Sequence, residues 1–330
     1  MSLNIRFLSN KEVNKFQSFV ETNWKKNHIL AKNKQVVSFF YNNKNKKRLN
    51  ILGMFKQNIL VGVLGLITFK NWDINLNNDI FMAFMTKSSK FKEDITFRFF
   101  NIINKEIKPN LLAVSGFNSK IELIYKRLGH IYNFSHFYIL NPKLKPKISR
   151  KLLLKKKQLS KKTNLTLKIS NKINYLPPSQ YYPKKSLTYF RSKYIQNPFY
   201  NYFVINFYEK KKIVFFFICK KIYVKNFNRS VYRIIDFCGR IKKNYDLNYL
   251  LSNLIIKDGI EYIDFRCVEY NNKIINNLGF SKKKSYQLIP DYFEPFVKKN
   301  IDLKLCIFKN KYKNLLIFKG DGDQDRPNIL

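Results

Sequence analysis

Hydrophobic and polar positions alternate along the first half of the chain in blocks that predict a definite order of helices and strands. Ser9 and Glu12 have the spacing of a helix capping box, and the apolar residues after them recur at helical intervals as far as His28. Apolar runs bounded by Asn-rich and Lys-rich turns then predict strands at Ile51–Phe55, Ile59–Phe69 and Ile80–Met85. The pattern continues with a helix on Ile95–Ile103, a strand at Leu111–Val114, a helix on Ile121–Leu128 and a closing strand at His136–Leu140.

The second half repeats this order, which indicates a divergent internal duplication. Strands are expected at Tyr202–Phe207, Ile213–Cys219 and Val231–Phe237, then a helix on Leu247–Ile255, a strand at Glu261–Cys267 and a short helix at Asn271–Leu278. We expect a terminal hairpin of Leu303–Phe308 with Leu315–Phe318.

A dense run of lysines with prolines at its start separates the two halves, as in many interdomain connections. We therefore expect an N-terminal domain at residues 1–142, a basic linker at 143–165 and a C-terminal domain at 166–330. A length of 330 residues suits two domains, each large enough to bury a core.

Composition places the chain among globular proteins despite its charge. Hydrophobic residues make up 45% and aromatic residues 16%, although the formal net charge is +42. Such a charge usually points to nucleic acid or an anionic membrane surface. Here Lys far outnumbers Arg, and Asn, Ile, Phe and Tyr are abundant, as AT-rich codon usage would produce, so the charge alone does not identify a ligand.

The cysteines stand singly in apolar runs, without a CxxC pair, and are expected to be reduced core residues. They are Cys219, Cys238, Cys267 and Cys306. The first residues lack the apolar region of a signal peptide, and no stretch reaches the roughly 18 apolar residues of a membrane span. We therefore expect a cytoplasmic protein, with peripheral membrane contact left open.

The order of elements and the segment NSKIELIYKRLGH resemble the GNAT acyltransferases, in which a helix begins with Asn and ends in a Tyr-x-x-Leu-Gly-Phe pattern. Asn118, Tyr125, Leu128 and Gly129 match this pattern, and Leu278–Phe280 repeats its end in the second half. The resemblance covers most of residues 5–140 and 185–320. It implies two tandem GNAT-like domains of the α/β class, each with a mixed sheet crossed by helices.

The resemblance also implies acetyl-CoA or another acyl-CoA as donor and an amine as acceptor, with no metal expected. GNAT enzymes usually hold the CoA pyrophosphate with a Gly-rich loop whose backbone N–H groups approach the phosphates. The stretch at 87–94 has no glycine, so this loop departs from the family. The second-half loop keeps Gly239 and has polar or cationic residues that we expect to bind the donor in its place. These residues are Arg240, Lys242, Lys243 and Asn244.

Acyl transfer needs a base for the amine. In the second half, Asp236 near the end of its strand and Glu269 after the following strand are the candidates for this base, and each has an ordinary structural role as its alternative. Tyr125 matches a position where some GNAT enzymes place a general acid, but its spacing with Ile121 and Leu128 favours core packing.

The C-terminal stretch KGDGDQDRPN is acidic in a chain with few acidic residues, and it resembles the endings of tandem GNAT-like proteins associated with bacterial surface-polysaccharide synthesis. We expect Asp321, Asp323, Asp325 and Arg326 to bind the acceptor, the carboxylates receiving an ammonium or sugar hydroxyls and Arg326 a phosphate. The alternative is an exposed acidic tail that pairs with surface lysines.

Taken together, the sequence predicts an acyl-CoA-dependent N-acyltransferase that acts on an amino sugar or similar amine in cell-surface glycan biosynthesis. One alternative is a catalytically inactive GNAT-like scaffold. Another is a basic protein that binds polyanions or nucleic acid, against which the basic residues are spread over the whole chain without a nucleic-acid motif. The oligomeric state is left open.

Overall fold

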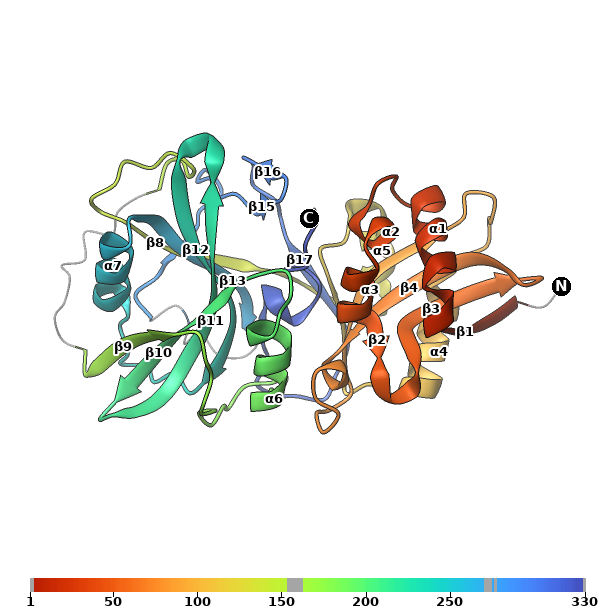
Figure 1. Cartoon of the computed structure of the whole chain (residues 1–330), viewed down its shortest axis with the longest axis horizontal. Coiled ribbons are helices and arrows are strands. Elements are labelled where there is room, and N and C mark those ends of the chain that lie inside the picture. The colour runs from red at the N-terminus through yellow and green to blue at the C-terminus, as the bar shows by residue number, and fades with distance from the viewer. Residues whose placement is uncertain (1–2, 153–162, 270–274, 276–277, 329–330) are drawn as a thin grey trace. The chain divides into compact units, whose positions relative to one another are not determined.

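The computed structural model describes residues 3–152, 163–269, 275 and 278–328, and Figure 1 shows how their elements are arranged. The chain forms two units that are interleaved along the sequence. Unit 1 consists of residues 1–131, 305–311 and 322–330. Unit 2 consists of residues 132–304 and 312–321. Most of the basic run at 153–162 lies outside the described residues.

Unit 1 is built on a mixed sheet of strands in the order β1-β3-β4-β5-β6-β17-β7. Its strands are β1 (Leu3–Ser9), β3 (Arg48–Lys56), β4 (Ile59–Thr68), β5 (Asp79–Lys87), β6 (Leu111–Ser115), β7 (His130–Asn133) and β17 (Lys304–Asn310), with the short β2 (Asn42–Asn43) beside β3. Its helices are α1 (Val13–Asn23), α2 (Ile29–Lys32), α3 (Lys34–Tyr41), α4 (Thr96–Ile102) and α5 (Ser119–Leu128). Strands β5 and β6 pair in parallel, as expected for strands joined by the crossover helix α4.

Alternation of side chains along the strands decides which helices cover which face of this sheet. Met82 on β5 packs in a core with Phe99 of α4 and Tyr125 of α5. The register of β5 with β4 shifts by one residue between Met82 and Phe84, and this β-bulge turns Phe84 to the opposite face, where it makes ring contacts with Phe16 of α1 and Tyr41 of α3. The sheet is therefore covered on both sides, as the sequence pattern predicts.

Unit 2 repeats the plan with strands in the order β14-β8-β13-β12-β11-β10-β9. Its strands are β8 (Ser135–Leu140), β9 (Leu165–Ser170), β10 (Tyr202–Glu209), β11 (Lys212–Val224), β12 (Arg229–Gly239), β13 (Ile260–Glu269), β14 (Ser281–Lys282) and β18 (Leu316–Phe318), with the small hairpin of β15 (Tyr292–Phe293) and β16 (Phe296–Val297). Its helices are α6 (Leu187–Phe190), which continues into the π-helical turn η5 (Arg191–Ile195), and α7 (Asn248–Lys257). The short turn η8 (Lys319–Asp321) follows β18.

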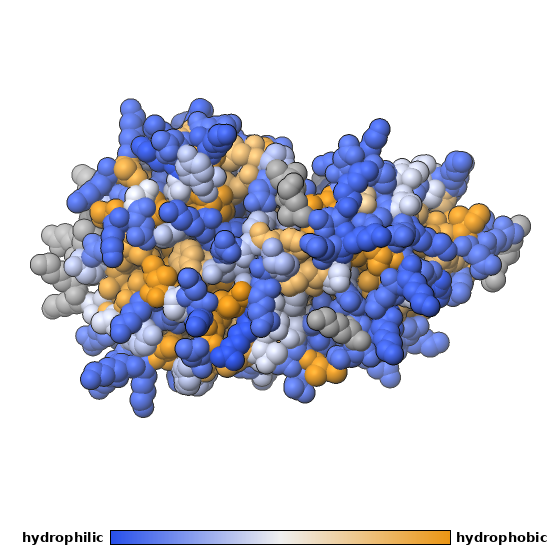
Figure 2. All heavy atoms as spheres, in the orientation of Figure 1, coloured by the Kyte–Doolittle hydropathy of each residue, from blue (hydrophilic) through white to orange (hydrophobic). Residues whose placement is uncertain are grey.

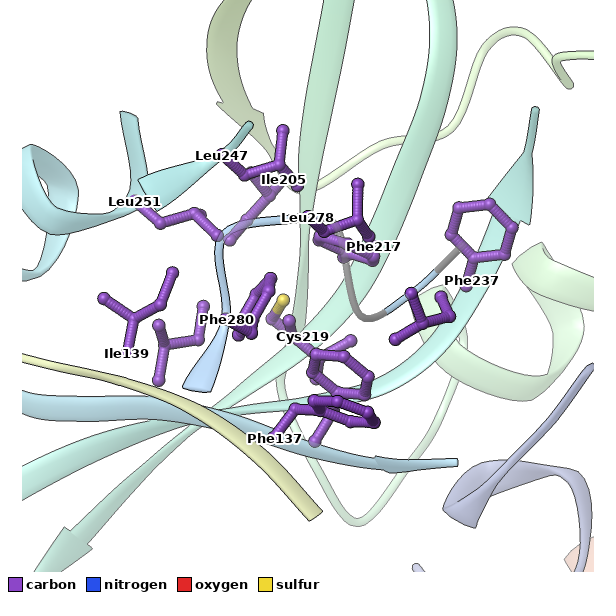
Figure 3. Close-up of a cluster of buried hydrophobic side chains, with 14 of the residues drawn as sticks. Phe137, Ile139, Ile205, Phe217, Cys219, Phe237, Leu247, Leu251, Leu278 and Phe280 are labelled. Atoms are coloured by element: carbon purple, nitrogen blue, oxygen red, sulfur yellow. The ribbon is translucent and has the colours of Figure 1, made fainter. Parts of the chain in front are cut away.

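The face of this sheet under α7 carries a large aromatic and aliphatic core (Figure 3). Phe217 of β11 and Leu251 of α7 belong to it, together with Phe137 of β8 and Phe280. On the other face, Phe216 meets Phe190 of α6. The run of three phenylalanines at 215–217 is explained by a strand that is buried on both faces.

Two predicted edges of the sheets are wrong. The strand at His136–Leu140 forms as β8, but it pairs with β13 of unit 2 instead of closing the first sheet. The predicted terminal hairpin does not form, because β17 pairs with β6 of unit 1 and β18 pairs with β13 of unit 2. Each strand therefore adds to a sheet whose other strands are distant in the sequence. The hydrophobic pattern of a strand predicts its buried face, but it does not predict which of two sheets the strand will pair with.

The other predicted strands and helices form, with bounds shifted by a few residues, and the short helix expected at Asn271–Leu278 lies largely outside the described residues. Strands β1 and β9 and helix α3 were not predicted. All four cysteines are free and buried, which confirms that part of the analysis. No helix of the described residues is long and apolar enough to cross a membrane. Figure 2 shows hydrophilic residues spread widely over the face drawn, with hydrophobic residues in smaller patches.

Candidate functional site

The loop after β12 is the predicted donor-binding segment of unit 2. Gly239 has φ +128°, and a Cβ atom there would meet Cα of Phe215 at 2.4 Å and the carbonyl oxygen of Val214 at 2.5 Å. The next residue, Arg240, donates its backbone N–H to the same carbonyl oxygen of Val214 at 3.1 Å. The glycine is therefore required by the close approach of β11.

The backbone at the start of α7 already has hydrogen-bond partners. Asp246 Oδ1 accepts from the N–H of Asn248 at 2.9 Å, and the carbonyl of Leu278 accepts from the N–H of Leu247 at 3.1 Å. A carboxylate at a helix N-terminus takes the place that an anionic ligand would prefer. The backbone cradle of a Gly-rich loop is therefore not reproduced here.

Side chains of this loop remain exposed to solvent. Lys242, itself exposed, is paired with Glu209 at 2.6 Å, and Arg240, Lys243 and Asn244 are the other exposed polar residues of the predicted set. These residues lie in the segment between β12 and α7, without a backbone site beneath them.

The corresponding loop of unit 1 is closed around its own residues. The ammonium of Lys87 donates to the carbonyl oxygens of Lys92 at 3.2 Å and Glu93 at 2.7 Å, and Phe91 is buried in the core. Asp94 Oδ1 accepts from the N–H of Thr96 at 2.8 Å, at the start of α4. This loop has no glycine, as noted in the sequence, and the Lys87 ammonium and the Asp94 carboxylate bond to backbone groups of the same segment.

In unit 2, the chain's own C-terminal segment lies where β12 and β13 stop pairing. The parallel pairing ends at Ile234 and Phe265, and β18 pairs with β13 immediately beyond, with Cys267 opposite Phe318. A Cβ atom on Gly320, in the turn after β18, would lie 2.6 Å from Ile235 Cγ2. The space beside the splayed strands is therefore filled by protein.

A buried cluster of charges lies beside this segment and includes two of the predicted site residues. The ammonium of Lys185 is bonded to Asp236 and lies 2.6 Å from Asp321 Oδ1. Both aspartates are fully buried, and the hydroxyl of Tyr194 donates to Asp236 Oδ2 at 2.8 Å. The two carboxylates stabilise the buried ammonium, because their oxygens replace the water molecules that burial removes from it.

The charges in this cluster change the proton affinities of its members. Burial alone would lower the pKa of Lys185, but the charges of Asp236 and Asp321 raise it above its ordinary value. Burial, together with the charge of Asp236, raises the pKa of Asp321 to about 6 against the opposing effect of Lys185. Lys185 is therefore a permanent cation here, and Asp236 is its counter-ion.

Sequence analysis missed the cationic members of the cluster. Lys193 donates to the hydroxyl of Tyr189 at 2.8 Å and to the carbonyl of Gly320 at 2.5 Å, and it is as deeply buried as Lys185. Lysines occur throughout this chain, so nothing in composition distinguishes these two. Both lie within four residues of the buried aromatic pair Tyr189–Phe190, which is the one local feature that sets them apart.

The two predicted bases have different surroundings. Asp236 is fully buried and committed to Lys185 and Tyr194. Glu269, at the end of β13, is only partly buried, and its Oε2 accepts from the N–H of Ile275 at 3.3 Å. Of the two, Glu269 is therefore the carboxylate with access to solvent.

Tyr125 has the core role that its spacing favours. It is 3% exposed, and its ring packs edge-on against Phe117 and Phe308. Burial raises the pKa of its hydroxyl above the ordinary value, so proton donation from this group is disfavoured.

The rest of the acidic C-terminal stretch belongs to unit 1 and is folded into it. Asp323 is 6% exposed and lies 3.5 Å from Arg326, and burial raises its pKa. Gln324 donates to the carbonyl of Ser115 at 3.2 Å. The alternative of an exposed acidic tail is therefore wrong for Asp321 and Asp323, while Asp325 is partly buried.

The predicted acceptor residues are consequently divided between two settings. Asp321 joins the Lys185 cluster of unit 2, and Asp323 pairs with Arg326 in unit 1. Among the residues that the structure describes, no group of three or more His, Cys, Asp or Glu side chains has the arrangement of a metal site.

Comparison with known proteins identifies similar folds and no similar sequence. No family model matches the chain, and no curated protein matches it in sequence. A GCN5-related N-acetyltransferase from Anabaena variabilis superposes with a TM-score of 0.52 at 10% identity over 93% of this chain and 73% of that one. A probable N-acyltransferase of unknown function from Enterococcus faecalis gives 0.51 at 8% identity, over 92% of this chain and 72% of that one. A GCN5-related N-acetyltransferase from Kribbella flavida also gives 0.51, at 7% identity over 92% and 70% of the two chains.

Proposed function

Because the chain is built of two GNAT-like α/β domains in tandem, we propose that it is an acyl-CoA-dependent N-acyltransferase, with acetyl-CoA or another acyl-CoA as donor and an amine as acceptor. The observation that carries the proposal is the set of exposed polar side chains in the loop Arg240–Asn244 between β12 and α7. In this fold the donor's phosphates are held at that turn, and here cationic side chains replace the missing backbone cradle.

Glu269 is the base in this proposal. It lies at the carboxyl end of β13, next to the strand that carries the donor loop, and it retains access to solvent. A positioned carboxylate that accepts the ammonium proton of the acceptor contributes typically 10²–10⁴-fold to the rate. Asp236 in this scheme supports the site through Lys185 and has no contact with the acceptor.

The acceptor is an amino sugar or similar amine of cell-surface glycan synthesis. The support for this narrower proposal is the resemblance of the C-terminal stretch to the endings of tandem GNAT-like proteins associated with bacterial surface-polysaccharide synthesis. Asp321 and Asp323 themselves are buried and paired with Lys185 and Arg326, so they do not add to it.

Calorimetric titration of the full chain with acetyl-CoA at physiological ionic strength tests donor binding. We expect micromolar binding that Arg240→Glu combined with Lys243→Glu weakens more than about tenfold, since each lost cation removes a charge-assisted contact. The matched control changes two exposed lysines of the same unit, Lys172→Glu and Lys257→Glu. A similar loss in both double variants, or equal affinity for ATP, would exclude a specific donor loop.

Acetyl transfer to nucleotide-linked amino sugars tests the reaction itself. Glu269→Gln should lower the rate by at least about a hundredfold while acetyl-CoA binding is unchanged. An unchanged rate in this variant would assign the base to another group.

A second candidate function follows from the position of β18. Its pairing with β13 fills the space where the splayed strands of this fold receive the donor's arm, and Asp246 occupies the start of α7. Both features suit a scaffold that keeps the fold without the reaction. Absence of acetyl-CoA binding in the titration would favour this function.

A further inference from the structure

A pocket of about 480 Å³ in unit 2 has a strongly cationic wall that the proposed acyl transfer does not use. It lies where the beginning of β8, the end of β13 and the segment after β14 meet. Its basic lining residues are Arg266, Lys282, Lys283, Lys284 and Lys304, and Asp302 is acidic. Arg266 is paired with Asp291, so the lysines supply the excess positive charge.

Backbone hydrogen bonds hold this wall in place. The N–H of Lys283 donates to the carbonyl of His136 at 2.8 Å, and the N–H of Phe134 donates to the carbonyl of Leu303 at 3.0 Å. Lys284 is fixed through its N–H, which donates to Gln287 Oε1 at 2.8 Å. These hydrogen bonds fix the backbone that carries Lys283 and Lys284 at the pocket.

Buried polar groups without a partner lie in the same lining. His136 and Arg266 are each 5% exposed, and His136 Nδ1 and Arg266 Nε have no hydrogen-bond partner among the described residues. Leaving such a group unpaired is unfavourable, because its hydrogen bonds to water are lost without replacement. Both atoms are covered by neighbouring protein atoms, so a ligand group would pair with them by displacing the side chains that cover them.

The protonation state of His136 decides whether its Nδ1 atom is a hydrogen-bond donor or acceptor. Its Nε2 lies 2.7 Å from Asp264 Oδ2, and Asp264 is also held by Arg233 at 2.7 Å, so it stays ionised and can only accept. Burial and the charge of Arg266 lower the pKa of His136 to about 4, so the ring is neutral and its proton is on Nε2. Nδ1 is therefore a hydrogen-bond acceptor for a hydroxyl or amino group.

We propose that this pocket binds a small phosphate-bearing molecule, with the phosphate on Lys282, Lys283, Lys304 and Arg266 and a hydroxyl or amino group of the ligand on His136 Nδ1. The site is separate from the Arg240–Asn244 loop and stands without the acyltransferase proposal. Ammonium groups and a guanidinium suit phosphate oxygens, and the imidazole acceptor distinguishes a hydroxylated or amino-bearing ester from free phosphate.

Calorimetry on the full chain with inorganic pyrophosphate and with uridine diphosphate tests the proposal at physiological ionic strength. Lys283→Gln should weaken both ligands about tenfold, and Lys257→Gln, an exposed lysine of the same unit outside the pocket, should change either less than about twofold. The pyrophosphate binding that Lys283→Gln weakens should persist in Arg240→Gln, which separates this site from any binding at the donor loop. Melting curves of each variant establish that it is folded.

His136→Phe provides the second arm, because it removes the acceptor and keeps a planar ring. We expect this change to lower the affinity for uridine diphosphate at least about fivefold more than the affinity for pyrophosphate, because one neutral hydrogen bond is lost. Equal weakening by Lys283→Gln and Lys257→Gln, loss through Arg240→Gln alone, or no binding of either probe would overturn the proposal.

Discussion

The two units end the pairing of their parallel strands next to the same C-terminal segment, but in different ways. In unit 2, β18 is hydrogen-bonded to β13, and Asp321 joins the Lys185 cluster. In unit 1, Gly322 lies beside Ser115, and Gln324 donates one hydrogen bond to the Ser115 carbonyl. The same stretch of sequence is thus integrated into a strand and an ion cluster in one unit and held by side-chain contacts in the other.

The two units share a fold but differ at the place where their parallel strands stop pairing. In unit 2, the pairing of β18 and the buried ion cluster fill this place, and the cationic side chains of the loop after β12 remain exposed. In unit 1, the corresponding loop is held by hydrogen bonds of Lys87, and residues of the C-terminal tail cover the ends of the parallel strands. Substitutions on each side should therefore have effects of different size.

The largest effect is expected from Lys185→Met. This change leaves Asp236 and Asp321 buried without their cation, which should cost about 3–5 kcal/mol of unfolding free energy. Denaturant titration followed by mass spectrometry of thiol labelling measures it, because Cys238 reports on unit 2 and Cys306 on unit 1.

Lys184→Met is the matched control for Lys185→Met. Lys184 donates to the carbonyl of Ser179 and is partly exposed, so we expect a loss below about 1 kcal/mol. Adding Asp321→Asn to Lys185→Met should restore part of the stability. Equal losses in the two single variants would show that the cluster does not hold β18 in unit 2.

The next largest effect is expected at acid pH, where the two units should lose different amounts of unfolding free energy. Burial lowers the pKa of His136 in unit 2 and of His28 in unit 1 to about 4, the charge of Arg326 adding to the effect on His28. A histidine with a lowered pKa stabilises the fold above its ordinary pKa near 6.5, and this contribution is lost as the pH falls toward 4.

For the fully buried His136 this contribution is on the order of 3 kcal/mol. His28 is partly exposed, so solvent screening makes its contribution smaller. The loss of stability between pH 7 and pH 4.5 should therefore shrink in His136→Gln by more than in His28→Gln. Asp321, whose raised pKa acts with the opposite sign between pH 4 and 6, is present in both variants and cancels. A larger change in His28→Gln would reverse the comparison.

The sequence predicted the fold class, and the structural similarities confirm two GNAT-like domains, because strand and helix periods survive where identity does not. It did not predict that β8 and β17 lie in sheets remote in sequence, since pairing partners depend on tertiary topology. The cluster around Lys185 was half predicted. The aspartates could be predicted as site residues because carboxylates are rare in this chain. The buried lysines could not, because apart from the nearby aromatic pair no feature of the surrounding sequence distinguishes them from the many other lysines.

A smaller effect distinguishes two glycines that are two residues apart. A Cβ atom on Gly320 would lie 2.6 Å from the hydroxyl of Tyr194 and 2.8 Å from the backbone oxygen of Ile235, so Gly320→Ala should cost about 1–3 kcal/mol. On Gly322 the nearest atom is Ser115 Oγ at 3.0 Å, a side chain that can rotate, so Gly322→Ala should cost less than about 1 kcal/mol. Thiol labelling at Cys238 and Cys306 measures both, and an equal cost would show that the two edges are packed alike.

The smallest effect is expected from Gln324→Ala. It removes one neutral hydrogen bond to the Ser115 carbonyl, which should cost about 1 kcal/mol in unit 1. Both tryptophans, Trp24 and Trp72, belong to unit 1, so the fluorescence transition in denaturant follows this unit. Asn328→Ala, at an exposed position of the same tail, is the control and should leave the transition unchanged. If Gln324→Ala instead shifts the fluorescence transition as far as Lys185→Met shifts Cys238 labelling, the tail is as integral to unit 1 as β18 is to unit 2.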